Sequence, residues 1–237
     1  MKNKLLLLIK MNKIETLCVF FISLLVVATV FINIRKQMEV DHSKIPPKVE
    51  LSSSFQKWIT NLRNKGVQLE ADEFTLVEEN EIYNTKWMKI YSMDEPGMAE
   101  ELDRVLLENR NQAKVIYAPS DRHFIDFSNK ERYGYQSNEV RLYGLKEDKI
   151  IDAKVVDCSV RGNCYYDRGY FLDNDVFVVT EVSRNITKHD ETVPACLPSE
   201  TCTYSFKLHL VDLNRNSRII YESTPFDAVL DKLIPEL

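Results

Sequence analysis

Two matched cysteine pairs carry the clearest chemical signal in this chain. Five residues separate Cys158 from Cys164, and five separate Cys196 from Cys202. Zinc sites use C-x2-C or C-x4-C spacings and redox enzymes use C-x-x-C, whereas an even number of cysteines at other spacings is typical of disulfides in an oxidising compartment. The spacing therefore predicts two structural disulfides and no metal site, and it leaves three connectivities open.

Histidines near carboxylates are the next candidates for a chemical role. His123 lies between Asp121 and Asp126, which supplies the minimum for acid–base catalysis but is also common at the edge of a strand. His209 lies in an alternating strand pattern and is expected to point to solvent. The sequence has no G-x-S-x-G or H-E-x-x-H motif and no phosphate-binding glycine loop. We therefore predict no catalytic residue and no cofactor.

One polar segment imitates the first half of a calcium-binding loop. Asp212, Asn214 and Asn216 place oxygen atoms at alternate positions. Ser217 then stands where such a loop needs glycine, and Glu222 falls one place short of the bidentate position. We therefore expect an ordinary hairpin turn here.

The charge of the chain bears on its partners. Residues 37–237 contain 25 basic and 35 acidic side chains, a formal charge of −10. Such a surface repels the phosphate backbone of nucleic acids and anionic lipid headgroups. We therefore predict that nucleic acid is not a partner.

Along the chain, the first predicted element is an apolar run from Thr16 to Ile34. About 20 apolar residues cross a bilayer as a helix, because each backbone amide must be satisfied within the helix. The run therefore predicts a transmembrane helix at 16–34 that anchors the chain in the membrane. Lysines precede it with only Glu15 to oppose them, so the positive-inside tendency places residues 1–15 in the cytoplasm and the remainder outside it.

A cleaved signal peptide is the alternative interpretation of this run. The run is longer than the usual apolar core of a signal peptide, and no clear small-x-small cleavage site follows it. We therefore prefer a retained anchor, with a single-pass protein in the membrane and its C-terminal domain extracytoplasmic.

A spacer and a small α+β segment follow the apolar run. Residues 35–50 contain Pro46-Pro47 and no apolar periodicity, which indicates a spacer. Residues 51–118 combine helical periodicity with short runs of strand character. The expected elements are a helix capped at Ser52–Ser54 and ended by Gly66, a strand at 86–93, a helix opened by residues 94–97 and a strand at 113–118.

Residues 119–237 are predicted to be a β-rich domain with an internal repeat. Val140–Leu145, a polar turn and Ile150-Ile151 are similar to Leu208–Leu213, a turn and Ile219-Ile220, and both copies predict hairpins. The order of strands resembles blades of WD40-like or TolB-like propellers, but two copies are too few to close a propeller of at least about four blades.

A turn between the two copies of the repeat completes the expected fold. Asp173-Asn174-Asp175 consists of turn-forming residues, and a reversal there brings the two cysteine loops to the same end of a sheet. We therefore expect an α+β protein whose β-rich antiparallel domain is an open sheet, a sandwich or a partial set of propeller-like blades.

Three classes of function remain open. The first is a membrane-anchored extracytoplasmic binding or scaffolding protein whose disulfide-stiffened loops bind an envelope protein or a ligand. The second is an anchored hydrolase that uses carboxylates. The third is a pilin-like or secretion-system subunit, since an apolar N-terminal helix before an α+β domain with a late disulfide is similar to that class. The sequence lacks the Gly-Phe-Thr-Leu-x-Glu junction of pilins, and we favour the first class over an enzyme.

Overall fold

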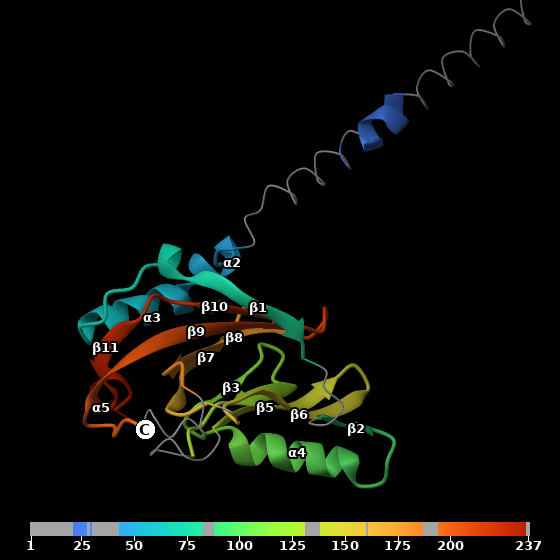
Figure 1. The fold of residues 1–237 in the computed structure, drawn as a ribbon. Helices are drawn as coiled ribbons and strands as arrows, with labels where there is room; N and C mark the ends of the chain where they lie inside the picture. Colours follow the sequence, from blue (N-terminus) through green and yellow to red (C-terminus); the bar gives the residue numbers. More distant parts are fainter. Residues whose placement is uncertain are drawn as a thin grey trace, which may run out of the picture. The chain divides into compact units, whose positions relative to one another are not determined.

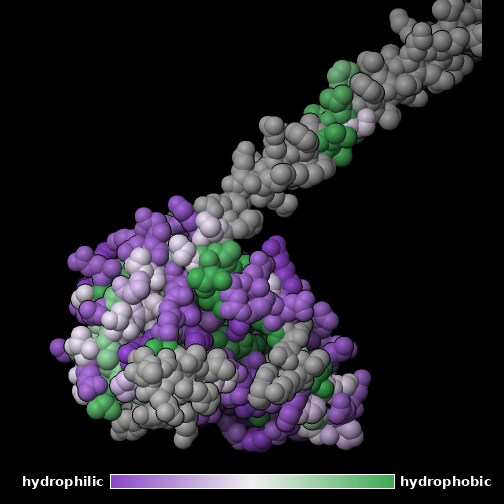
Figure 2. Space-filling view, viewed as in Figure 1, coloured by the Kyte–Doolittle hydropathy of each residue, from purple (hydrophilic) through white to green (hydrophobic). Residues whose placement is uncertain are grey.

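The computed structural model describes residues 21–27, 29, 43–82, 88–130, 138–159, 161–186 and 194–235 (Figure 1). The chain divides into two compact units, Met1–His42 and Ser43–Leu237. In the first unit, residues 21–27 and 29 are helical and exposed, and Figure 2 shows them as mainly hydrophobic. Within the described residues, no helix combines the length and the hydropathy that a bilayer crossing requires. Thr16 and Ile34, the ends of the predicted span, lie outside those residues, so the transmembrane helix stays a prediction.

Two open antiparallel sheets form the centre of the second unit, as expected for the α+β class. The first sheet has the order β1-β10-β9-β8-β7, with β11 paired to β9, and the second has the order β2-β6-β5-β4-β3. The strands of the first sheet are β1 (Thr75–Glu81), β7 (Cys164–Phe171), β8 (Val176–Ser183), β9 (Thr201–Asp212), β10 (Ser217–Glu222) and β11 (Phe226–Val229). Those of the second are β2 (Met88–Ser92), β3 (Val115–Tyr117), β4 (His123–Asp126), β5 (Glu139–Lys146) and β6 (Lys149–Asp157).

The sheets pack face to face, and a helix covers the outer face of each (Figure 1). Between the sheets, Ile125 and Leu142 of the second sheet share one apolar cluster with Phe177 and Val211 of the first. Helix α3 packs on the first sheet and helix α4 on the second, which gives four layers in the order α, β, β, α. The helices are α2 (Pro47–Glu50), α3 (Ser53–Asn64), the 3-10 helix η1 (Ala71–Glu73), α4 (Met98–Asn109) and α5 (Leu230–Leu233).

Helix α3 forms where the sequence predicts it. The Ser52 hydroxyl accepts a backbone N–H of the first turn, and Gly66 follows the helix with φ 89°, a conformation that glycine adopts without strain. The apolar stripe of the helix is buried against the first sheet. Its Trp58 ring lies edge-on to Phe206 of β9 with a centroid distance of 5.1 Å, and its indole N–H donates to Asp167 at 2.7 Å. Burial of each large side chain stabilises the fold by roughly 1.5–3 kcal/mol.

The segments 51–118 and 119–237 are hydrogen-bonded to each other in both sheets. Strand β1 pairs with β10, β2 pairs with β6, and β3 pairs with β4. The two copies of the repeat form the hairpins β5–β6 and β9–β10. These hairpins lie in different, opposed sheets, so they are not successive blades of a propeller.

Candidate functional site

The structure brings both cysteine pairs to disulfide-bonding distance, each within its own loop. Cys158 pairs with Cys164 and Cys196 pairs with Cys202. Asn163, which is buried, joins the two loops: its Nδ2 donates to the Cys196 carbonyl at 2.8 Å, and its Oδ1 accepts the Cys196 N–H at 2.7 Å. The two loops therefore lie at the same end of the first sheet, as the predicted turn between β7 and β8 implies.

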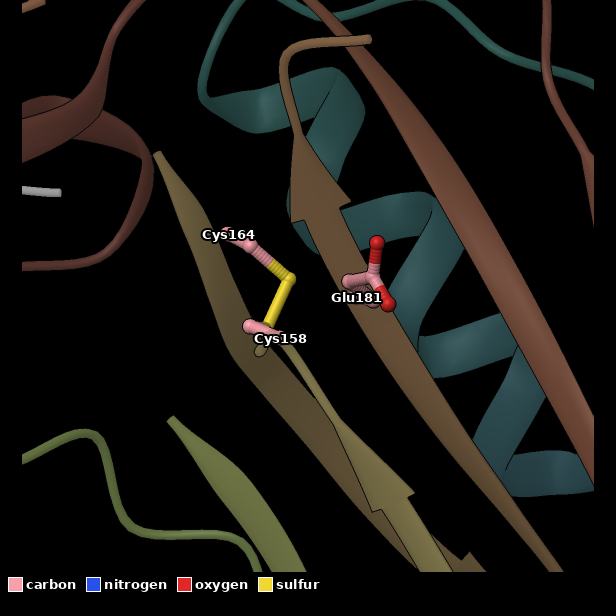
Figure 3. Close-up of side chains that lie close together, drawn as sticks. All are labelled: Cys158, Cys164 and Glu181. Atoms are coloured by element: carbon pink, nitrogen blue, oxygen red, sulfur yellow. A yellow bond between two sulfur atoms is a disulfide. The ribbon is translucent and has the colours of Figure 1, made fainter. Parts of the chain in front are cut away.

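A fully buried carboxylate lies beside the first disulfide (Figure 3). Glu181 extends from β8, and one of its oxygens lies within 4.8 Å of the sulfurs of Cys158 and Cys164. Arg161, from the loop that this disulfide closes, binds both oxygens of Glu181. His209 of β9 places its Nε2 at 2.9 Å from the same carboxylate. The disulfide thus closes the loop that supplies the charge partner of Glu181.

The charges around Glu181 determine its ionisation. Burial alone would raise the pKa of Glu181, but the charge of Arg161 and the hydrogen bond from His209 hold it well below its usual value. Ser183 donates a further hydrogen bond to the carboxylate at 2.7 Å. Glu181 is therefore ionised and accepts hydrogen bonds on both oxygens.

His209 has one partnered and one unpartnered ring nitrogen. Burial lowers its pKa despite the hydrogen bond and the charge of Glu181, so the ring is neutral. The hydrogen bond to an ionised carboxylate assigns the proton to Nε2 and leaves a lone pair on Nδ1. Nδ1 is buried, and it has no hydrogen-bond partner among the residues that the structure describes. A buried acceptor without a partner costs about 1–3 kcal/mol, which makes it a feature that needs explaining.

A cavity of about 460 Å³ adjoins this group, between β1, β9 and β10 of the first sheet and β6 of the second. Its volume falls in the range of roughly 300–1,000 Å³ that is typical of ligand pockets. His209 lines the cavity together with four cationic and three anionic side chains. These are Lys154, Arg161, Lys207 and Arg218, and Glu78, Glu81 and Asp157.

One of the four cations differs from the others. Three of them have a carboxylate partner: Lys154 pairs with Glu139, Lys207 with Glu222, and Arg161 with Glu181. In the part of the chain that the structure describes, no carboxylate lies within 4 Å of the Arg218 guanidinium. Arg218 is half-buried, and its hydrogen bonds go to neutral acceptors, from Nε to Asn80 Oδ1 at 3.0 Å and from Nη1 to the Val155 carbonyl at 3.1 Å. Burial lowers the pKa of Arg218, although the charges of Glu78 and Glu181 act in the opposite direction.

The histidines do not lie where the sequence suggests. The prediction that His209 points to solvent is wrong, since 1% of it is exposed. Its face of β9 is covered by the second sheet, while α3 covers the other face. His123 is buried with Nε2 at 2.6 Å from the Asn174 carbonyl. The carboxylates beside it in the sequence bond elsewhere: Asp126 accepts a backbone N–H, and Asp121 lies 3.8 Å from Arg110.

The segment that imitates a calcium loop is the turn of the β9–β10 hairpin. Asp212 Oδ1 accepts the N–H groups of Asn214 and Arg215 at 3.0 and 3.1 Å, so its oxygen closes the turn. Among the described residues, two groups of three side chains lie close enough together to hold a metal ion: Cys158, Cys164 and Glu181, and Cys196, Glu200 and Cys202. Each group contains the two cysteines of one disulfide. A sulfur in a disulfide is not a thiolate, so neither group is a metal site while its disulfide is closed.

Sequence analysis missed Glu181, Arg161 and Arg218 as candidate residues. Glu181 is the one charged residue of β8, a strand whose other residues are apolar apart from a threonine and a serine. A charged residue in such a strand is rarely fully buried unless it is paired, and this is the signal by which the sequence marks it. Arg218 gives no comparable signal.

Comparisons with known proteins do not assign this chain to a family. No family model matches it, and searches against curated proteins and solved structures gave no match. Its function is therefore argued from the geometry of the cavity itself.

The ionisation of Glu181 and His209 predicts that acid destabilises the protein. A carboxyl with a lowered pKa stabilises the fold above its unfolded value of 4.5, and that contribution is lost as the pH falls. A histidine with a lowered pKa takes up a proton more readily when unfolded, so stability is also lost as the pH falls below 6.5.

Urea unfolding across pH is the measurement. We expect the free energy of unfolding to fall from about neutral pH to pH 5, and more steeply below about pH 4.5. The loss of stability between neutral pH and pH 5 should be smaller in His209→Gln. His123 contributes to the loss that is left in this variant, because burial also lowers the pKa of His123. A rise in stability between neutral pH and pH 5 would contradict the prediction.

Proposed function

We propose that this protein is a single-pass membrane protein whose folded domain lies outside the cytoplasm and binds a small polar ligand between its two sheets. The apolar run from Thr16 to Ile34, with lysines before it, supports the anchor and its orientation. The two cysteine pairs support an oxidising compartment. Figure 2 shows the visible face of the domain as mainly hydrophilic, as expected for a domain in water.

One observation carries the binding role. Arg218 is a half-buried cation that has no carboxylate within 4 Å among the described residues, and it lines a cavity of ligand size. A charge that is removed from water without a partner is costly, and structural ion pairs normally neutralise it. A ligand that supplies the missing acceptor would explain why the other cations of the cavity are paired and this one is not.

A hydrolase is the second candidate, because Glu181 orients an imidazole whose other nitrogen is free. That arrangement is the base and orienting pair of nucleophilic catalysis. Among the described residues, however, no serine or cysteine is hydrogen-bonded to His209 Nδ1. Glu181 is held ionised by Arg161 and is no proton donor. The geometry therefore favours binding over catalysis.

The location of the domain is tested by thiol labelling in intact cells. We expect a membrane-impermeant maleimide to label Cys158, Cys164, Cys196 and Cys202 only after a reductant is added, because the thiols are exported and oxidised. Labelling that requires cell lysis but no reductant would place the domain in the cytoplasm and overturn this part of the proposal.

The binding role is tested by native mass spectrometry of the full-length protein purified from its membranes in detergent. We expect a bound small molecule in the wild type and its loss in Cys158→Ser/Cys164→Ser, because the open loop no longer holds Arg161. The matched control is Cys196→Ser/Cys202→Ser, which opens a ring of the same sequence separation, 6, that contributes no residue to the cavity, whereas the first ring contributes Arg161. Each opened ring is expected to cost about 2 kcal/mol of stability. Equal retention of the molecule in both variants would contradict the proposed site.

A further inference from the structure

Arg218, which has N–H groups beyond those bonded to Asn80 and Val155, and His209 lie on neighbouring strands and on the same face of the first sheet. Arg218 of β10 pairs with Val211 of β9, which is two residues from His209. The two side chains are therefore diagonal neighbours, with Cβ atoms roughly 7 Å apart. Arg218 is a charged donor, and His209 Nδ1 is a lone-pair acceptor. One small molecule satisfies both if it has an acceptor and a donor close together.

The geometry of Arg218 favours a carboxylate as the acceptor. A guanidinium has five N–H donors in a planar fork, and two hydrogen bonds from Arg218 go to neutral groups of the protein. The remaining N–H groups match the two oxygens of a carboxylate or phosphate. The charges around Arg218 distinguish between these two anions.

Two acidic side chains of β1, Glu78 and Glu81, line the cavity together with this cation. Asn80 links it to Glu78, because the amide oxygen accepts from Arg218 while Nδ2 donates to Glu78 at 2.5 Å. Glu78 and Glu81 are exposed, and residues 37–237 have a formal charge of −10. Because the other three cations of the cavity are each paired with a carboxylate, the acidic side chains at the rim attract a cationic group and disfavour a dianionic phosphate. A ligand with one carboxylate and one ammonium has no net charge and is not repelled.

Resting on the proposed ligand-binding role, we infer that the cavity binds a zwitterionic α-amino acid. Its carboxylate accepts hydrogen bonds from the N–H groups of Arg218 other than those bonded to Asn80 and Val155. Its ammonium faces Glu78, and it donates to His209 Nδ1, directly or through one water, once the His209 ring turns Nδ1 from its buried position toward the cavity. Val77, Val155 and Ile220 line the cavity beside these groups and accommodate the amino-acid side chain.

The test uses the full-length protein in detergent. Each standard L-amino acid is screened by thermal shift, and the one with the largest shift is titrated by calorimetry. We expect saturable binding, and a loss of affinity of at least about tenfold in Arg218→Gln. The matched control is Arg215→Gln, which removes an exposed arginine of the same hairpin that pairs with Asp212, and it should bind like the wild type.

Derivatives of the same amino acid test the wild-type protein directly, so the test does not depend on the folding of a variant. The N-acetyl derivative lacks the ammonium, and the amide lacks the carboxylate. We expect each to bind at least about tenfold more weakly. If the N-acetyl derivative bound as tightly as the free amino acid, the inference that the ligand is a zwitterion would be overturned.

The remaining outcomes separate this inference from the proposed function. If no amino acid binds but the purified protein carries another small molecule that Arg218→Gln loses, the amino-acid inference fails and the binding role stands. If no molecule is bound and no amino acid shifts the unfolding temperature, both fail.

Discussion

Replacing Glu181 by glutamine is expected to lower the free energy of unfolding by about 3–5 kcal/mol. The substitution keeps the shape of the side chain but removes the charge that Arg161 and His209 share. His209 is almost fully buried, and the side chain of Arg161 is 20% exposed, so neither recovers much hydration when its partner is lost. Urea unfolding monitored by circular dichroism at neutral pH measures the change.

The control for this substitution is Glu79→Gln, which removes an exposed carboxylate from β1 and should change stability by less than about 0.5 kcal/mol. A double-mutant cycle with Arg161→Met separates the pair from its surroundings, because the coupling energy of groups in contact is about 0.5–3 kcal/mol. If Glu181→Gln were as mild as Glu79→Gln, the buried network would not be a determinant of this fold.

The elements of this fold that depend on local sequence are those that the sequence predicts well. Helix α3 follows from a capping serine, a stripe of apolar residues and a glycine, all within fifteen residues. The hairpins β5–β6 and β9–β10 follow from alternation on either side of a polar turn. In each case the pattern and the contact that it reflects lie close together in the chain.

The repeat shows where such reasoning ends. When the two copies are aligned by sequence, Arg141 of β5 occupies the position equivalent to His209 of β9. Arg141 is exposed and pairs with Asp152, whereas His209 is buried between the sheets. Alternation assigns a residue to one face of a strand, but the layer that covers this face comes from a distant part of the sequence.

The cavity depends most strongly on contacts between residues that are distant in the sequence. Arg218 meets Asn80, which lies 138 positions away, because β1 pairs with β10. Arg161 meets Glu181 because the disulfide loop at the end of β6 lies beside β8. No motif records these contacts, since they depend on sheet order and register. The sequence therefore predicts the two cysteine pairs, one of which lies beside Glu181, but not the charges of the cavity.

Sheet register also makes one glycine essential, and we expect Gly144→Ala to cost roughly 3 kcal/mol or more. Gly144 lies in β5 opposite His123 of β4, with φ 140°. A Cβ there would overlap the carbonyl oxygen of Arg122 and the backbone of His123. Both obstacles belong to the neighbouring strand, so relief requires the two strands to separate. Chemical unfolding of the variant measures the cost.

The matched control is Gly66→Ala at the end of α3. Gly66 also has a positive φ, 89°, but nothing lies within 4 Å of an added Cβ. Only the backbone conformation is then strained, which costs about 1–2 kcal/mol. The difference between the two variants isolates the close approach of β4 and β5. Equal costs would show that backbone conformation alone requires glycine at residue 144, and that β4 moves freely enough to accept a side chain there.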